Sequence, residues 1–154
     1  MNECCCPPPR TWRTCPSCGA IGSVVDASTV KALLVREALT RVENTRFRFC
    51  AAPACAVVYF SATGATFSTG DLDVPVLQKS APGARTVCYC FGENEADIRR
   101  EIEDTGRTGA IERVRANMAV DRCACAVRNP RGVCCLGDLV AATRDVELRV
   151  RVRA

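Results

Sequence analysis

The chain has 154 residues, enough for one ordinary domain or two small ones, and it carries a net charge of +4, 13 cysteines and no histidine. A disulfide-stapled secreted protein is disfavoured, because the N-terminus lacks an apolar signal segment, the cysteine count is odd, and closely spaced cysteines rarely pair with each other. No apolar run approaches the roughly 18 residues that a membrane span needs. The composition therefore predicts a reduced cytoplasmic protein whose thiolates bind metal.

The elements predicted before residue 80 are mostly extended. Residues 1–14, which contain three consecutive cysteines and then three prolines, are predicted to be a flexible tail. Residues 26–42 predict one helix, capped by Ser28 or Thr29, because apolar residues recur there at helical spacing. Residues 46–50 and 56–60 are rich in strand-forming residues, and 72–79 is predicted to be a further extended segment.

A predicted linker at 80–85, with Pro82 and Gly83, separates this β-rich part from a helical one. Helical periodicity follows at 93–106, 108–119 and 135–146, and a basic tail is predicted at 146–154. The predicted fold class is α+β. It consists of a small β-rich, zinc-ribbon-like subdomain at 15–79 and a small helical subdomain at 86–145.

Four cysteines of the β-rich part form the first candidate metal site. The knuckle C-P-S-C-G contributes Cys15 and Cys18, and a C-x4-C loop contributes Cys50 and Cys55. Four thiolates close a tetrahedral structural zinc site. Buried free thiols and a redox C-x-x-C motif are the alternatives, and the redox motif belongs in a βαβ context that this sequence lacks.

The second candidate site begins at Cys88 and Cys90. Side chains two apart in an extended segment point the same way, so these two thiolates can hold one iron of a 2Fe–2S cluster. The second iron needs two more thiolates from the helical part. Four candidates supply them: Cys123, Cys125, Cys134 and Cys135. Zinc is the competing ion here, and the absence of histidine excludes a Rieske-type cluster.

These motifs resemble a known family. The stretches "VCYCFG", "E..I..EI" and "NPRGVCCLGDL" resemble the bacterioferritin-associated ferredoxin type of 2Fe–2S domain. Together with "CPSCG", "FRFCAAPACAVVYF" and "DLDVPVLQK", they resemble CopZ-type copper chaperones, which join a zinc-binding N-terminal part to such a 2Fe–2S domain. The resemblance extends over residues 13–142, nearly the whole chain.

The resemblance implies two ligand sets. It places zinc on Cys15, Cys18, Cys50 and Cys55, and the cluster on Cys88, Cys90, one cysteine of "CAC" and one of "CC". Cys125 is preferred to Cys123, because it precedes the Asn-Pro turn at the family spacing. Cys135 is preferred to Cys134, because it leads directly into a predicted helix whose first amides can point at thiolate and sulfide.

The sequence departs from the family in one respect. CopZ-type chaperones are expected to carry a further heavy-metal-associated domain with an M-x-C-x-x-C loop, and no cysteine follows Cys135. This predicts either cooperation with a separate copper chaperone or transient binding of Cu+ by Cys4, Cys5 and Cys6. An inert tail is the alternative for these three thiols.

The leading functional hypothesis is a metallochaperone for copper or another soft metal, with one-electron reduction of that metal. Its expected partners are metal ions and a copper-transporting ATPase. The alternative is a ferredoxin-like electron carrier with structural zinc. Nucleic-acid binding is less favoured, because the predicted strands lack a clustered basic and aromatic face. No enzymatic catalysis is expected. Each half should depend on its own metal, so loss of zinc should leave the cluster largely intact.

Overall fold

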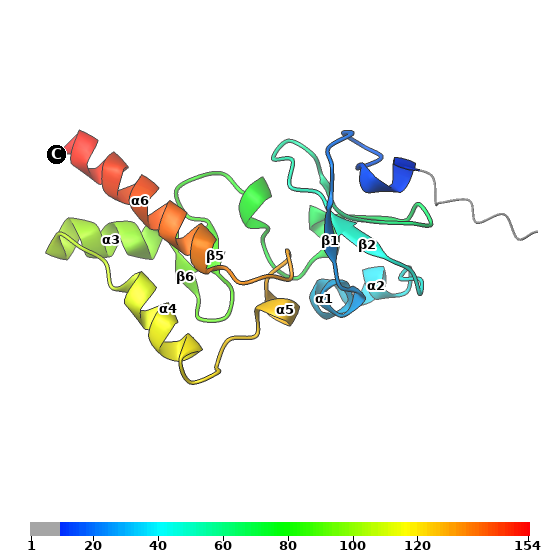
Figure 1. The fold of residues 1–154 in the computed structure, drawn as a ribbon. Helices are drawn as coiled ribbons and strands as arrows, with labels where there is room; N and C mark the ends of the chain where they lie inside the picture. Colours follow the sequence, from blue (N-terminus) through cyan, green and yellow to red (C-terminus); the bar gives the residue numbers. More distant parts are fainter. Residues whose placement is uncertain (1–9) are drawn as a thin grey trace, which may run out of the picture.

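The computed structural model describes residues 10–154 and shows two lobes, a sheet lobe at 10–79 and a helical lobe at 80–154 (Figure 1). Cys4, Cys5 and Cys6 lie outside the described residues. An antiparallel sheet and a set of helices together confirm the predicted α+β class. No helix in residues 10–154 has the length and apolar character that crossing a bilayer requires.

The sheet lobe is built on a four-stranded antiparallel sheet in the order β1-β2-β3-β4. The strands are β1 (Ser23–Val25), β2 (Phe47–Phe49), β3 (Val57–Ser61) and β4 (Thr66–Ser68). Phe47, Phe49 and Tyr59 project from one face into the main core, where α1 (Ala27–Leu33) covers them through Val30. The opposite face carries Phe60, which packs against the cysteines of the first candidate site.

The helix predicted at 26–42 is in fact two short helices, α1 and α2 (Arg36–Leu39). Between them Leu34 forms a β-bridge with Leu72, and the Val35 amide donates to the Asp71 carbonyl. Pairing with these distant residues outweighs the local helical preference. The N-cap is also different from the prediction, because the Asp26 carboxylate accepts the Ser28 amide at 2.8 Å.

The structure also corrects both predicted tails. Residues Arg10–Arg13 form a 3-10 helix, η1, and Trp12 stacks against arginines of the sheet lobe, so the tail predicted at 1–14 extends too far. The tail predicted at 146–154 is helical, because α6 (Leu136–Arg153) continues through it. Val146 and Val150 carry the apolar face of α6 onward against the helical core.

The helical lobe packs α6 across α3 (Glu95–Thr105) and α4 (Ala110–Met118). Two short strands, β5 (Thr86–Cys88) and β6 (Glu93–Asn94), pair beside them, and α5 (Cys125–Arg128) precedes α6. As predicted, Gly106 ends α3 in a left-handed conformation, with φ of 82°. The segment predicted to be extended at 72–79 instead ends in a 3-10 helix, η3 (Leu77–Lys79), and another, η2 (Thr69–Asp71), precedes it.

The two lobes are joined by specific contacts, which changes the expectation that they act independently. α5 of the helical lobe lies directly against α1 of the sheet lobe (Figure 1). The buried Tyr59 hydroxyl donates to the Pro130 carbonyl at 2.7 Å, and the Thr29 hydroxyl donates to the Ala126 carbonyl. Buried polar groups need such partners, so these hydrogen bonds favour one defined arrangement of the two lobes.

The predicted linker is also fixed in place. The Lys79 ammonium donates to the carbonyls of Ala52 and Cys55, both at 2.8 Å, within the loop that carries part of the first candidate site. On the other side, the buried Glu95 carboxylate accepts the amides of Gly83 and Arg85 and an ion pair from the Arg85 guanidinium. The segment between the lobes therefore holds a defined path.

Candidate metal centres

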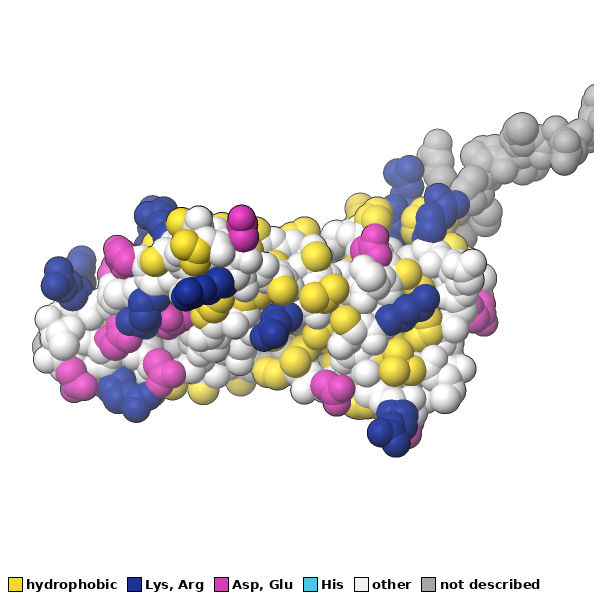
Figure 2. Space-filling view, turned by 90° about the horizontal axis from the view of Figure 1, so that it is seen from below, with side chains coloured by type: hydrophobic (Ala, Val, Ile, Leu, Met, Phe, Trp, Pro, Cys, Tyr) yellow, Lys and Arg dark blue, Asp and Glu magenta, His cyan; other side chains and the backbone are white. Residues whose placement is uncertain are grey.

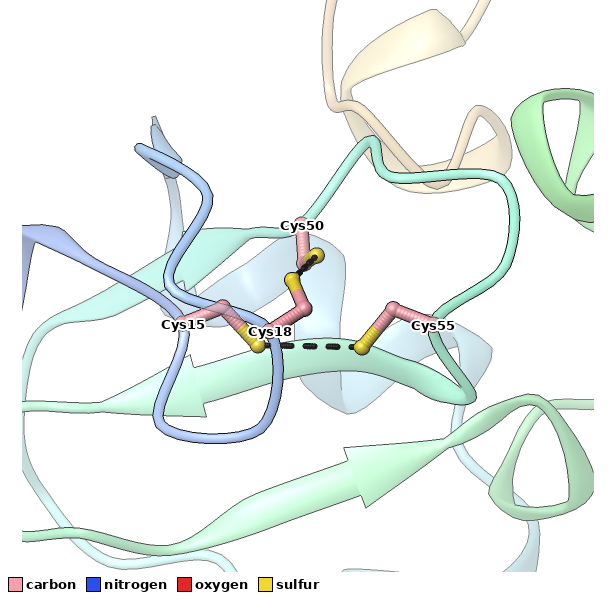
Figure 3. A group of neighbouring side chains, drawn as sticks. All are labelled: Cys15, Cys18, Cys50 and Cys55. Atoms are coloured by element: carbon pink, nitrogen blue, oxygen red, sulfur yellow. Dashed lines mark hydrogen bonds between the residues drawn. The ribbon is translucent and has the colours of Figure 1, made fainter.

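The first candidate site lies at one end of the sheet lobe, where four cysteine side chains point toward one another (Figure 3). Two come from the turn between η1 and β1, and two flank the loop between β2 and β3. The sulfurs of Cys15 and Cys55 are 3.8 Å apart, and those of Cys18 and Cys50 are 3.6 Å apart. Four thiolates about 2.3 Å from a tetrahedral zinc ion lie about 3.8 Å from one another. The donor set and its spacing therefore fit zinc.

Local backbone geometry explains this convergence. The knuckle closes because the Gly19 amide donates to the Cys15 carbonyl at 2.8 Å, with Gly19 at a φ of 76°. Glycine adopts this left-handed conformation without steric cost. Gly22 is required for a different reason, since a Cβ there would lie 2.5 Å from the ring of Phe60. The knuckle can therefore pack closely on the sheet face that supports the site.

In the absence of a metal, the pKa values of these thiols differ from one another. Burial raises the pKa of Cys50 to about 12. Burial also acts to raise the pKa of Cys55, but the Val57 amide and the neighbouring Ser17 side chain donate hydrogen bonds that lower it to about 7. A metal ion binds thiolates, so it must displace protons from the thiols with raised pKa. Zinc uptake at this site is therefore coupled to proton release.

The second candidate set occupies the helical lobe, close to the junction with the sheet lobe. Cys88 ends β5 and is fully buried, and Cys135 is the N-cap of α6 with 2% of its surface exposed. Cys90 and Cys125 are half-buried, and their sulfurs are 3.7 Å apart. The structure thus brings together the four cysteines chosen from the sequence. Their role as cluster ligands stays a prediction.

Contacts between sulfurs link the C-x-C motif to the later cysteines. Cys88 interacts with Cys135 and Cys90 with Cys125, and Cys135 also interacts with Cys125. Of the two cysteines in the C-x-C motif, Cys88 ends β5, and Cys90 lies in the following turn. The alternation of an extended strand therefore does not apply to this pair.

Backbone amides surround this second set of sulfurs. The Ala124 amide donates to the Cys90 sulfur at 3.2 Å, and the Cys135 amide donates to the Cys125 sulfur. A hydrogen bond from the Cys135 thiol, together with the Phe91 amide, lowers the pKa of Cys88 to about 6. Amide donors stabilise negative charge on sulfur and tune the potential of iron–sulfur clusters. This environment suits an anionic centre.

A tight turn returns the chain from α5 to α6. The Gly132 amide donates to the Asn129 carbonyl at 2.7 Å, and the Asn129 side chain donates to the Val133 carbonyl. Gly132 has a φ of 69°, and a Cβ there would lie 2.9 Å from the Thr29 hydroxyl of α1. This turn positions Cys125 and Cys135 on one side, whereas Cys123 and Cys134 are exposed.

The residues that hold this turn against the sheet lobe were not predicted from the sequence. Tyr59 and Thr29 lie far from the turn in the sequence, and no motif connects them to it. A cluster of basic and aromatic side chains at Trp12 was not predicted either, because that cluster forms only when η1 folds back on β2.

Comparison with known proteins agrees with the first site. Residues 13–73 match the CopZ-type family described as a zinc binding domain. The fold resembles the X-ray structure of the Archaeoglobus fulgidus CopZ N-terminal domain, with a TM-score of 0.69 and 30% sequence identity. The alignment covers 83% of this chain and 95% of that domain. A search among curated proteins gives no match.

Proposed function

This chain belongs to the family of the CopZ N-terminal domain, and we propose that it is an iron–sulfur and zinc metallochaperone that handles copper or another soft metal. In this proposal Cys15, Cys18, Cys50 and Cys55 hold zinc. Cys88, Cys90, Cys125 and Cys135 hold a 2Fe–2S cluster. No catalytic role is assigned to any side chain.

Zinc at the first site is supported by the compact tetrahedral spacing of its sulfurs, which all lie within 4.8 Å of one another. It is also supported by the family match, which covers all four cysteines. The role proposed for this ion is structural. Three of the four cysteines are buried, and the closed set of four thiolates leaves no open coordination position.

One observation carries the cluster proposal: the four sulfurs of the second set contact one another in a chain and accept hydrogen bonds from backbone amides. Within residues 10–154 these sulfurs do not form a second group as compact as the zinc site. Four thiolates with a wider overall spacing suit a two-iron cluster better than one zinc ion. When bound and reduced, such a cluster can donate one electron.

The surroundings of the second set suit exchange with a soft metal. Cys90 and Cys125 are half-buried, and the exposed thiols of Cys123 and Cys134 lie next to cluster cysteines in the sequence. Thiolates favour Cu(I) over harder ions. A cluster held at the second set would supply the electron that reduces Cu(II) to Cu(I) and would itself become oxidised. The exposed thiols of Cys123 and Cys134 would then be available to retain Cu(I).

A redox titration with and without copper tests this function. If copper handling is coupled to the cluster, one equivalent of Cu(I) should shift the cluster's potential, because a bound cation favours the reduced, more negative cluster. The shift should disappear when Cys123 and Cys134 are both replaced by serine. An unchanged potential in the wild-type protein would support the ferredoxin-like alternative.

A further inference from the structure

The strongest unassigned feature is a group of basic and aromatic side chains beside the zinc site. The Arg48 guanidinium lies 4.2 Å from the centre of the Trp12 ring, and that of Arg46 lies 5.2 Å from it. Arg13 adds a third positive charge near Arg48. We define Trp12, Arg13, Arg46 and Arg48 as the arginine patch. It lies outside both candidate metal sites.

Within residues 10–154, no carboxylate forms an ion pair with Arg13, Arg46 or Arg48. The guanidiniums of Arg46 and Arg48 both contact the Trp12 ring, so two like charges are held close together. Like charges held together cost free energy that a bound anion would recover.

Arg48 is held in a fixed orientation. One of its guanidinium nitrogens donates to the Gly22 carbonyl at 2.5 Å, while its Nε is buried and lacks a hydrogen-bond partner in the described structure. A buried N–H without a partner is costly, and native structures rarely retain one without a reason. The side chain is therefore ordered before any ligand arrives.

Exposed apolar side chains lie next to the charges. Val24 pairs directly across from Arg48 in the register of β1 and β2, so both project from the same sheet face, and 68% of Val24 is exposed. Ile21, which is 80% exposed, precedes β1. Figure 2 shows Lys and Arg side chains flanking hydrophobic ones at the end of the molecule where the described chain begins. β1 is also an edge strand of the sheet.

We propose that the arginine patch, with Val24 and Ile21, binds an acidic segment of a partner protein. Carboxylates of that segment would pair with the guanidiniums, and its apolar side chains would cover Val24 and Ile21. An edge strand also allows an extended peptide to approach its main chain. This site adds a docking surface to the proposed metal chemistry.

A single-stranded nucleic acid fits the patch less well. Bases bind such surfaces by stacking on open aromatic rings, and here two guanidiniums already contact the Trp12 ring. A phosphate backbone would also gain nothing from exposed Val24 and Ile21. The observations therefore favour a peptide that carries both acidic and apolar side chains.

The test uses the full-length protein with its metals and a short labelled peptide of glutamate, leucine and glycine. Fluorescence anisotropy measures binding, and the emission of Trp12, the single tryptophan of the chain, reports whether binding occurs at the patch. Arg46→Glu should weaken binding about tenfold or more, and added salt should weaken binding to the wild type. Val24→Ser should weaken it as well, because apolar contact is lost.

Arg107→Glu is the matched control, because it makes the same charge change at an exposed residue of the helical lobe and should bind like the wild type. Zinc content and circular dichroism check that each variant is folded. Equal weakening by Arg107→Glu, or no binding to the wild-type protein, would overturn the proposal. Tighter binding of single-stranded oligothymidine that Arg46→Glu abolishes would also overturn it, as would self-association that depends on Arg46.

Discussion

Replacing Cys50 by serine is expected to abolish zinc binding and to unfold the sheet lobe. Cys50 is completely buried, and its sulfur contacts that of Cys18 across the site. Structural zinc contributes on the order of 10 kcal/mol to the folding of small zinc domains, which is comparable to the whole stability of an ordinary domain. The core of this lobe is small, so it cannot replace that contribution.

The same change should also lower the cluster content. The turn between Cys125 and Cys135 rests on α1 of the sheet lobe, and Tyr59 and Thr29 hold it there. Unfolding the sheet lobe removes these supports, so the two later cluster cysteines would lose their fixed positions. Metal analysis per chain and visible absorption measure both effects on protein purified without oxygen.

Two further variants separate the effect of losing zinc from the effects of losing any one thiol and of weakening the contact between the lobes. Cys123→Ser removes an exposed thiol and should leave both zinc and cluster near wild-type levels. Tyr59→Phe keeps every cysteine and removes the hydrogen bond to Pro130, so zinc should remain while the cluster is lost more readily on heating. A zinc-free Cys50→Ser protein with a full cluster would show that the lobes are independent after all.

Serine replacements at the cluster cysteines should fall into an ordered series of effects. Cys88→Ser and Cys90→Ser are expected to be the most damaging, because no other cysteine lies near either one in the sequence. Cys125→Ser and Cys135→Ser should be intermediate, since Cys123 and Cys134 can substitute in part. Cys123→Ser and Cys134→Ser should resemble the wild type, because both thiols are exposed.

Cluster occupancy in this series is measured by visible absorption relative to protein concentration. Loss of the cluster in Cys134→Ser, with retention in Cys135→Ser, would reverse the choice within that pair. Such a result would conflict with the 2% exposure of Cys135 and its position at the start of α6. Retention of a full cluster in the Cys88→Ser/Cys90→Ser double variant would contradict the second candidate site altogether.

The sequence alone predicted those features of the structure that depend on short-range patterns. The knuckle at Cys15 and Cys18 predicted a metal site, and the structure brings these residues together with Cys50 and Cys55. The three longer helices of the second lobe, α3, α4 and α6, followed from apolar periodicity, with Gly106 at the end of α3, whereas the short helix α5 was not predicted. Each of these features depends on residues that are close in the sequence or on motifs with characteristic spacing.

The remaining features depend on contacts between distant residues. Leu34 is not helical, because it forms a β-bridge with Leu72. The helix α6 continues past residue 145, because Val146 and Val150 pack against the core of the helical lobe. No local sequence pattern predicts the hydrogen bond between Tyr59 and Pro130, which joins the lobes. The arginine patch likewise needs η1 to place Trp12 over Arg48. Tertiary packing overrides local preference at all these positions.

The measurement that tests the central claim most directly is the metal and sulfide content of the full-length protein, purified without oxygen. The account predicts iron, acid-labile sulfide and zinc in a ratio of roughly 2:2:1 per chain, with a visible spectrum that bleaches on reduction. Zinc alone, at roughly two ions per chain and with no iron, would contradict it. In that case Cys88, Cys90, Cys125 and Cys135 would form a second zinc site, and the proposed electron transfer to copper would have no donor.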